Sequence, residues 1–210
     1  MSRQNDDKIT RIVEKGVEGE WSPMNAPDAF DPPSLKDVPR EELHPFLQRL
    51  MDEHEAFTRK LTIFEELLGQ ITEKGFSKEV DEGLRRFFRH FDDEIIKHQH
   101  IEEAGLFPEL DRRLLESGEH SQGPDTFTSV KLMQDEHLKS IQLAAVVFNF
   151  FGLAARLPDA ASRLVTLDVA IEQGKALVES LRLHMFREDN IIFPLAHKHI
   201  DRDTFDKLES

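Results

Sequence analysis

The sequence predicts an all-α protein, a four-helix up-and-down bundle with an extended N-terminal arm. Three observations predict this class. Apolar residues recur at spacings of three and four over several long stretches, proline and glycine fall between those stretches, and no run alternates β-branched residues as strands do. Long helices with short connections pack side by side as a bundle. A chain of 210 residues suits one domain that can bury its own core.

Residues 1–40 form the predicted arm. This stretch is rich in proline and acidic residues and shows no sustained helical or strand period. It also carries the apolar residues Trp21, Phe30 and Leu35. Because large apolar side chains are stabilised by leaving water, we expect the arm to wrap over the bundle, with a flexible tail as the alternative.

The first two helices are predicted from their apolar stripes and end signals. In the first, Pro45 suits the opening turn and Gly75 marks the end. Its stripe consists of Phe46, Leu50, Phe57, Leu61, Phe64, Leu68 and Ile71. The second helix follows Ser77, a candidate N-cap, and runs to Phe107, where Pro108 is expected to end or kink it.

The last two helices follow a loop at residues 118–125. The third is expected from about residue 126 to residue 157, and its apolar run 143–157 suits a buried core helix. Pro158 and Asp159 turn the chain and cap the fourth helix, which is expected to reach Phe193 and Pro194.

The domain organisation follows from these elements. The arm occupies residues 1–40, the bundle residues 41–200, and a C-terminal tail residues 201–210.

Composition excludes several classes of partner and site. With 41 acidic and 27 basic residues the net charge is −14, so we expect neither nucleic acid nor a membrane surface as a partner. The chain has no cysteine, which excludes disulfides and thiolate ligands and leaves its ten histidines and its carboxylates for any metal. The N-terminus lacks the apolar core of a secretory signal, so we expect a cytoplasmic protein whose protein partner is unknown.

Two segments repeat one pattern of ionisable residues. "HQHIEEAGLFP" begins at His98 and "HMFREDNIIFP" begins at His184; each has a histidine, a glutamate four residues later, a second acid, and Phe-Pro. Each is preceded one helix earlier by a lone histidine, in "MDEH" ending at His54 and "QDEH" ending at His137. The doubled pattern is far more specific than any one histidine, which is usually a core or cap residue.

Helical spacing predicts that these side chains converge. His98 and Glu102 lie one turn apart on a helix face, as do His184 and Glu188. Antiparallel neighbours can bring a lone histidine beside each pair. Buried carboxylates need compensating cations, and imidazole with carboxylate suits iron, manganese or zinc. The predicted metal-binding residues are His54, His98, Glu102, His137, His184 and Glu188.

Other bundle chemistries fit less well. Ferritin-type di-iron proteins need a Glu-x2-His pair on each of two helices, and here only Glu41 and His44 have that spacing, at a helix start. The chain has no tyrosine for a radical or a phenolate ligand. His100 and Glu103 lie off the ligand stripe and are expected at the surface, whereas Glu94 is a candidate partner for the other ring nitrogen of His98.

Over residues 43–200 the sequence resembles the hemerythrin-like, cation-binding family. The resemblance implies a four-helix bundle around two iron ions joined by an oxo or hydroxo bridge, with His54, His98, His137 and His184 as terminal ligands and Glu102 and Glu188 as bridges. The pattern of four histidines and two glutamates is similar to the subgroup linked to iron-centre repair and nitric oxide stress.

Two departures qualify the resemblance. The oxygen carriers have a fifth histidine four residues after the third-helix ligand, where this chain has Ile141. They also use a His-x4-Asp spacing on the last helix, which His184 and Asp189 satisfy. Asp189 is therefore the alternative to Glu188, although an i+5 ligand needs local unwinding of the helix.

The resemblance implies a small ligand: peroxide, nitric oxide or dioxygen. We expect a redox or nitrosative stress function, and an enzyme that consumes peroxide or nitric oxide is one reading. A module that reversibly binds or senses dioxygen or nitric oxide is the alternative, and iron storage or delivery is a third. No catalytic residue is predicted beyond the metal ligands.

Overall fold

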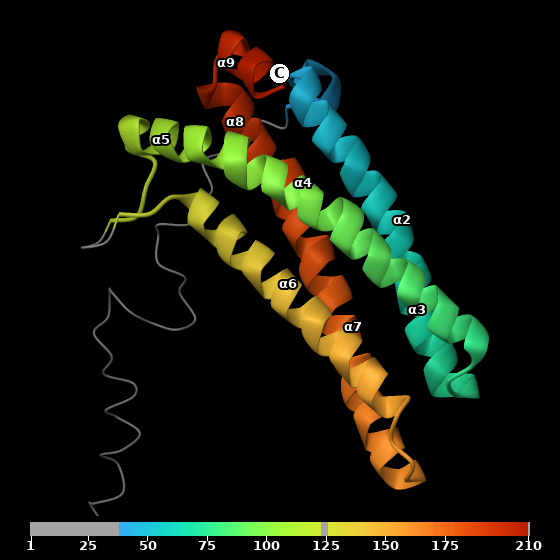
Figure 1. Cartoon of the computed structure of the whole chain (residues 1–210). Helices are drawn as coiled ribbons and strands as arrows, with labels where there is room; N and C mark the ends of the chain where they lie inside the picture. The colour runs from blue at the N-terminus through green and yellow to red at the C-terminus, as the bar shows by residue number, and fades with distance from the viewer. Residues whose placement is uncertain (1–37, 123–125, 210) are drawn as a thin grey trace, which may run out of the picture.

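The protein is all-helical in a computed structural model that describes residues 38–122 and 126–209, which contain no strand. The predicted all-α class is confirmed. Trp21, Phe30 and Leu35 of the predicted arm lie outside the described residues. Within the described residues, four long helical rods run alternately up and down beside one another, and a short helix lies near the C-terminus (Figure 1).

The first rod is helix α2, Pro45–Lys74, which follows a short 3-10 turn, η2, at Arg40–Glu42. His44 is the N-cap, and its Nδ1 accepts a hydrogen bond from the backbone N–H of Phe46. Gly75 ends the helix with φ of 79°, a conformation that only glycine adopts readily. Both ends agree with the sequence prediction.

The second rod consists of five consecutive helical segments. Ser77 is its N-cap, as predicted, and accepts a hydrogen bond from the N–H of Val80. The segments are α3 (Lys78–His90), the π-helical η3 (Phe91–Ile95), α4 (Ile96–Ile101), the π-helical η4 (Glu102–Leu106) and α5 (Phe107–Ser117). Pro108 was expected to end or kink the helix. The end does not occur, because a separate helical segment, α5, follows the π-helical turn and the rod stays helical to Ser117.

The π-helical segments explain why proline is tolerated within a rod. A proline inside an α-helix removes one hydrogen bond and collides with a carbonyl group one turn earlier. Here the N–H of Phe107 bonds to the carbonyl of Glu102, five residues back, so the turn before Pro108 is widened. The fourth rod repeats the arrangement, with Phe193 bonded to the carbonyl of Glu188 ahead of Pro194.

The third rod is helix α6, and the fourth continues beyond Pro194. Thr128 and Asp159 are the N-caps of the two rods. Their segments are α6 (Ser129–Ala154), α7 (Ala160–Arg187), the π-helical η5 (Glu188–Ile192) and α8 (Phe193–His199). The predicted tail includes a further helix, α9, at Arg202–Leu208, and its Phe205 is buried beside His44.

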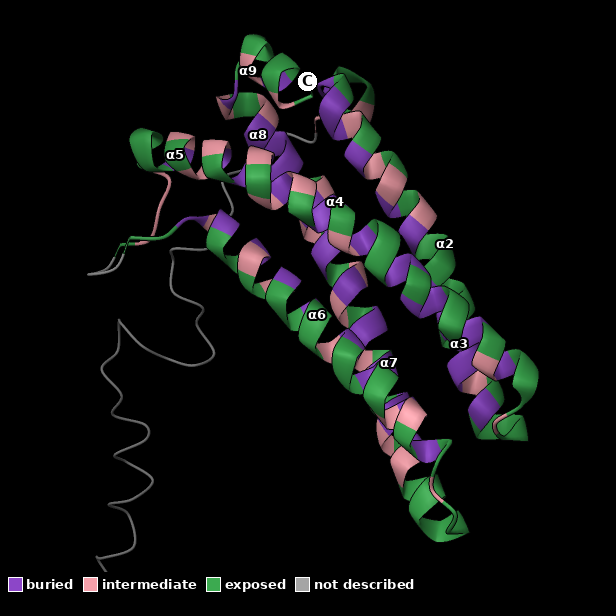
Figure 2. Cartoon of the chain, viewed as in Figure 1, coloured by how far each residue is buried: buried purple, intermediate pink, exposed green. Residues whose placement is uncertain are grey.

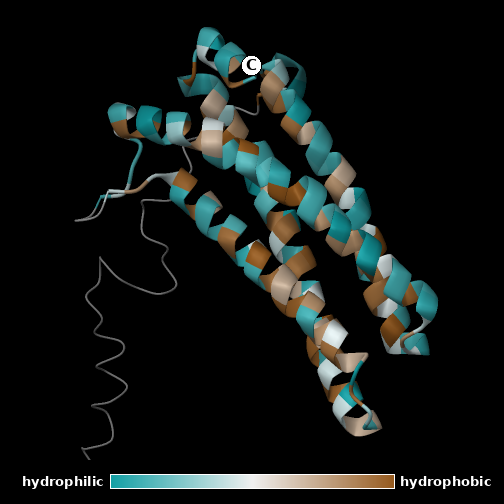
Figure 3. Cartoon of the chain, in the orientation of Figure 1, coloured by the Kyte–Doolittle hydropathy of each residue, from teal (hydrophilic) through white to brown (hydrophobic). Residues whose placement is uncertain are grey.

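Helix α6 is only partly buried. Its inward face contributes Val147 and Phe151 to the core, whereas Val146, Phe148 and Leu153 are exposed. Figure 2 shows exposed residues along α6, and Figure 3 shows hydrophobic residues along the same helix. The prediction that the run 143–157 is a buried core helix therefore holds for its inward face and is wrong for its outward face. By length and composition α6 could also cross a membrane. In its most apolar 18-residue stretch, 33% of the residues are buried.

The buried apolar residues form two clusters, one toward each end of the rods. On the first rod, Leu50 belongs to one cluster and Phe57 to the other, and His54 lies between them. On the second rod, His98 and Glu102 lie in the same way between Ile95 and Leu106. The third and fourth rods have the same order, so all four rods bring ionisable residues to one layer between two apolar cores.

Candidate metal centre

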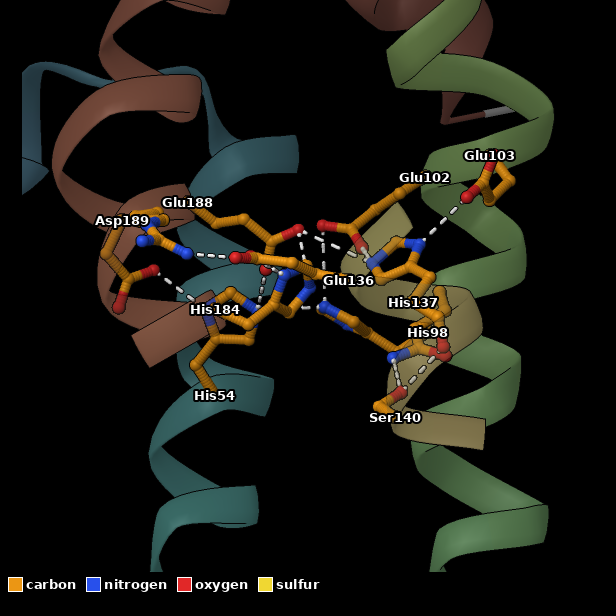
Figure 4. A network of polar contacts seen from close by, with 12 residues as sticks. His54, His98, Glu102, Glu103, Glu136, His137, Ser140, His184, Glu188 and Asp189 are labelled. Carbon is orange, nitrogen blue, oxygen red and sulfur yellow. Dashed lines mark hydrogen bonds and ion pairs between the residues drawn. The ribbon is translucent and has the colours of Figure 1, made fainter. Parts of the chain in front are cut away.

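Six ionisable side chains meet in that layer, and each is at least 96% buried (Figure 4). They are the six residues predicted from the repeat: His54, His98, Glu102, His137, His184 and Glu188. They make two sets of ligand atoms that could each hold a metal ion. The His54 group consists of His54, His98, Glu102 and Glu188, and the His137 group of Glu102, His137, His184 and Glu188.

The two glutamates belong to both groups because their two oxygens point to different histidines. Glu102 Oε1 lies 3.5 Å from Nε2 of His98, and its Oε2 lies 3.5 Å from Nε2 of His137. Glu188 Oε2 lies 3.3 Å from Nε2 of His54, and its Oε1 lies 3.1 Å from Nε2 of His184. Each carboxylate can therefore bridge two cations.

The inner polar atoms fit a pair of bound cations. Both oxygens of Glu102 and of Glu188, with Nε2 of His137 and of His184, are buried and have no hydrogen-bond partner of good geometry. Nε2 of His54 faces Nε2 of His98 at 2.9 Å. When both rings carry their proton on Nδ1, the lone pairs of the two Nε2 atoms point at each other. A proton or a metal ion must then lie between them.

The outer ring nitrogen of each histidine contacts another carboxylate. The four distances from Nδ1 are 2.7 Å for His54 to Asp189, 2.6 Å for His98 to Glu53, 2.9 Å for His137 to Glu103, and 3.1 Å for His184 to Glu136. We call Glu53, Glu103, Glu136 and Asp189 the outer carboxylates. They hold the ring orientations that turn every Nε2 inward.

These contacts correct two predictions. Glu103 is not a free surface residue, because it contacts His137 and also accepts a hydrogen bond from Gln134. Glu94 does not serve His98; its Oε1 lies 2.9 Å from Nδ1 of the buried His90. His100 is exposed, as predicted.

A signal for the outer carboxylates was present in the repeat. Glu53 and Glu136 immediately precede the lone histidines, and Glu103 and Asp189 immediately follow the bridging candidates. Their roles could not be assigned along one helix, because each contacts a histidine on a different rod.

The buried charges shift several pKa values in the metal-free protein. Burial lowers the pKa of His54, but its contacts with Asp189 and Glu188 outweigh burial and raise that pKa to about 10. Burial likewise lowers the pKa of His137, and Glu102 and Glu188 raise it to about 10. Without metal, protons therefore supply positive charge beside the two glutamates.

The fourth rod shows the same coupling. Burial lowers the pKa of His184, but attraction to Glu188 and the hydrogen bond to Glu136 raise it to about 9. Burial raises the pKa of Glu188, and the surrounding imidazoles, His184 first, hold it well below its usual range. Glu188 stays ionised in a dry layer, which is the state a cation requires.

The Phe-Pro frames place aromatic rings against the lone histidines. Phe193 stacks on His54 with ring centroids 5.6 Å apart, and Phe107 stacks on His137 at 5.4 Å. Phe57 meets His98 edge-on at 5.2 Å. These apolar rings keep water from the inner atoms.

A small cavity of about 10 Å³ adjoins the centre. Its polar wall consists of His54, His98, His184, Glu188 and Gln99, and its apolar wall of Phe57, Leu61, Ile95, Leu181 and Met185. About 10–15 Å³ is enough for one water-sized molecule. The cavity is therefore at the size limit for one water-sized molecule and is too small for an organic substrate.

The third rod shows what lies at the position of the missing histidine. Ile141 stands there and is exposed, at 39%. Ser140 is the buried residue there, and its hydroxyl donates to the carbonyl of His137 at 2.8 Å and accepts from Gln99 at 3.1 Å.

Comparison with known proteins agrees with the geometry of the centre. Residues 46–196 match the family model described as the hemerythrin HHE cation-binding domain. Comparisons with curated proteins and with solved structures gave no match. The matched region contains all four rods except their outermost residues and all six inner ligand candidates. The chain therefore belongs to the hemerythrin HHE cation-binding domain family.

Proposed function

We propose that the chain is a non-haem di-iron protein that acts on small oxidants, namely peroxide, nitric oxide or dioxygen, in a redox or nitrosative stress response. The observation that supports this proposal is the pair of adjoining ligand groups that share Glu102 and Glu188. Imidazole and carboxylate without thiolate suit iron, and cations at both groups compensate the two buried carboxylates. Two iron ions held there would supply electrons to an oxidant.

The protein's own residues would govern access and orientation. The outer carboxylates hold the four histidine rings at Nδ1, so that each ring offers its Nε2 inward. The bridging candidates offer one oxygen to each group. The apolar wall of the small cavity, with Leu61, Leu181 and Met185, would admit a small molecule while excluding bulk water.

Reversible binding or sensing without turnover is the alternative. The same cavity supports it, since a small space with one apolar wall adjoins the inner ligand candidates, where a very small molecule can bind and leave unchanged. The difference between the two functions is whether the ligand leaves unchanged.

Stopped-flow absorbance separates these functions. Protein reconstituted with ferrous iron without oxygen is mixed with dioxygen, peroxide or nitric oxide. The redox function predicts rapid oxidation in air, one round of oxidation of the ferrous centre by peroxide or nitric oxide, and repeated turnover of either when an excess of an external electron donor returns the iron to the ferrous state. A dioxygen complex that lasts for many minutes and releases its gas under vacuum supports the alternative, and no spectral change with any of the three contradicts both.

Two variants control this experiment. Glu188→Ala removes a bridging candidate and should abolish the response together with bound metal. His100→Ala removes an exposed histidine two residues from His98 and should leave the response unchanged.

A further inference from the structure

The outer carboxylates link the four rods in one closed order. Glu53 on the first rod contacts His98 on the second, and Glu103 on the second contacts His137 on the third. Glu136 on the third contacts His184 on the fourth. Asp189 on the fourth returns to His54 on the first. Figure 4 shows Glu103, Glu136 and Asp189 beside their histidines. With Glu53, every rod gives one carboxylate to the next rod and receives one from the rod before it.

We propose that this carboxylate ring positions the four histidines and that each half of it controls metal binding at one group. The proposal rests on the proposed function, because it concerns the same pair of ligand groups. Its new content is the assignment of Glu53, Glu103, Glu136 and Asp189 as positioning residues and the division of their effects between the two groups.

The chemistry of imidazole gives each outer carboxylate a definite task. A neutral imidazole carries one N–H, and a metal requires the other nitrogen with its lone pair free. A carboxylate that accepts from Nδ1–H therefore selects the form that presents Nε2 inward, and it also increases the basicity of Nε2. Because each acceptor lies on a neighbouring rod, it fixes the rotation of the ring as well as its protonated nitrogen.

The contacts divide the ring into two halves. Glu53 and Asp189 hold His98 and His54, the two histidines of the His54 group. Glu103 and Glu136 hold His137 and His184, the two histidines of the His137 group. Loss of one outer carboxylate should weaken one metal position and spare the other.

The outer carboxylates of the two halves differ in their contacts with other side chains. Glu136 forms an ion pair with Arg187 and is only 14% exposed, and Glu103 accepts a hydrogen bond from Gln134. Exposure alone does not separate the halves, because Glu103 is 32% exposed and Glu53 and Asp189 are 35% and 26% exposed. The difference lies in the added contacts of Glu136 with Arg187 and of Glu103 with Gln134. We therefore expect the His137 group to keep its metal more firmly than the His54 group.

Cobalt(II) titration of the metal-free protein, followed by visible absorbance without oxygen, tests this assignment without redox chemistry. Wild type should bind two equivalents. Glu53→Ala should weaken one of the two equivalents about 10- to 100-fold and leave the other unchanged. Glu53→Gln keeps an acceptor oxygen and the side-chain volume, so it should fold like wild type and show a smaller loss.

Glu94→Ala is the matched control. Glu94 also lies beside a ring nitrogen of a buried histidine, but that histidine, His90, belongs to neither ligand group. This variant should bind both equivalents like wild type. An equal loss in Glu94→Ala and Glu53→Ala would contradict a specific role for the ring.

Double variants identify the half that is affected. Glu53→Ala added to His98→Ala should cause little further loss, because the carboxylate no longer has a ring to hold. Glu53→Ala added to His184→Ala should weaken the remaining equivalent by its full factor, about 10- to 100-fold, because the two changes then damage different groups. Full additivity in both combinations would overturn the division into halves.

The same titration separates failure of this inference from failure of the proposed function. The ring proposal alone is overturned if wild type binds two cobalt ions and alanine variants of all four outer carboxylates bind them with wild-type affinity. Wild type that binds no metal overturns both. If wild type and variants bind cobalt as predicted but the iron form reacts with no oxidant, the proposed function is overturned and the ring proposal stands.

Discussion

Asp189 Oδ1 lies 2.7 Å from Nδ1 of His54, on the opposite edge of the same imidazole from Glu188, whose Oε2 lies 3.3 Å from Nε2. The two acids that are adjacent in sequence therefore approach one histidine from its two nitrogens. This separation assigns Glu188 to the inner set and Asp189 to the outer carboxylates.

Replacement of these two acids should have unequal effects. Glu188→Ala removes an atom pair shared by both ligand groups, so it should lose most bound iron and the absorbance of a bridged pair. Asp189→Ala should weaken only the His54 group. Metal analysis after gel filtration compares the bound iron of the two variants. Loss of iron in Asp189→Ala with iron retained in Glu188→Ala would reverse the assignment.

The metal-free protein should lose stability as pH rises above neutrality. The folded-state pKa values of His54, His137 and His184, about 9 to 10, exceed the ordinary value of 6.5. The stability that their contacts supply is complete below about pH 6.5 and is lost as pH rises through 9 to 10. The lowered pKa of Glu188 acts at the other end, because its contribution is lost as pH falls below about 4.5.

Thermal melting of chelator-treated protein checks this pH dependence. The melting temperature should be highest between about pH 5 and pH 6.5 and should fall by pH 9.5. The metal-loaded protein should not show the same loss, since its imidazoles are already deprotonated when they bind metal. A melting temperature of the metal-free form that rises from pH 6 to pH 9.5 would be inconsistent with protonated histidines in the layer.

Filling the small cavity should slow reaction without removing metal. Leu181→Phe enlarges a side chain that lines the cavity beside His184. Leu177→Phe, one turn earlier on α7, makes the same change in the same apolar cluster away from the cavity. Overpacking should cost each variant about 1–3 kcal/mol of stability.

Stopped-flow rates with dioxygen or nitric oxide distinguish the pair. We expect a slower reaction for Leu181→Phe alone, at unchanged iron content in both variants. Equal rates for the two variants would mean that ligands reach the centre by another path.

The inner residues were accessible to sequence reasoning because their spacing is local. His98 with Glu102 and His184 with Glu188 are one turn apart on a single helix, so helical periodicity alone places each pair on one face. Doubling of the frame then pointed to a shared site. The structure brings all six together in one layer.

The outer contacts could not be predicted in the same way. The contacts of Glu53 with His98 and of Glu103 with His137 depend on how neighbouring rods are rotated, which no single helix determines. Pro108 was expected to end or kink the helix because α-helical geometry was assumed. A π-helical turn at Glu102–Leu106 accommodates the proline, so the rod continues to Ser117. Such turns leave no simple periodic signal, and they begin at the bridging candidates Glu102 and Glu188.

Iron content per chain, measured after anaerobic reconstitution and removal of free metal, tests the central claim most directly. Two adjoining groups that share Glu102 and Glu188 predict two iron ions per chain. His98→Ala and His184→Ala, which each damage one group, should bind fewer. Wild type that retains a single ion, or that retains only zinc when offered both metals, would contradict the account of a di-iron centre.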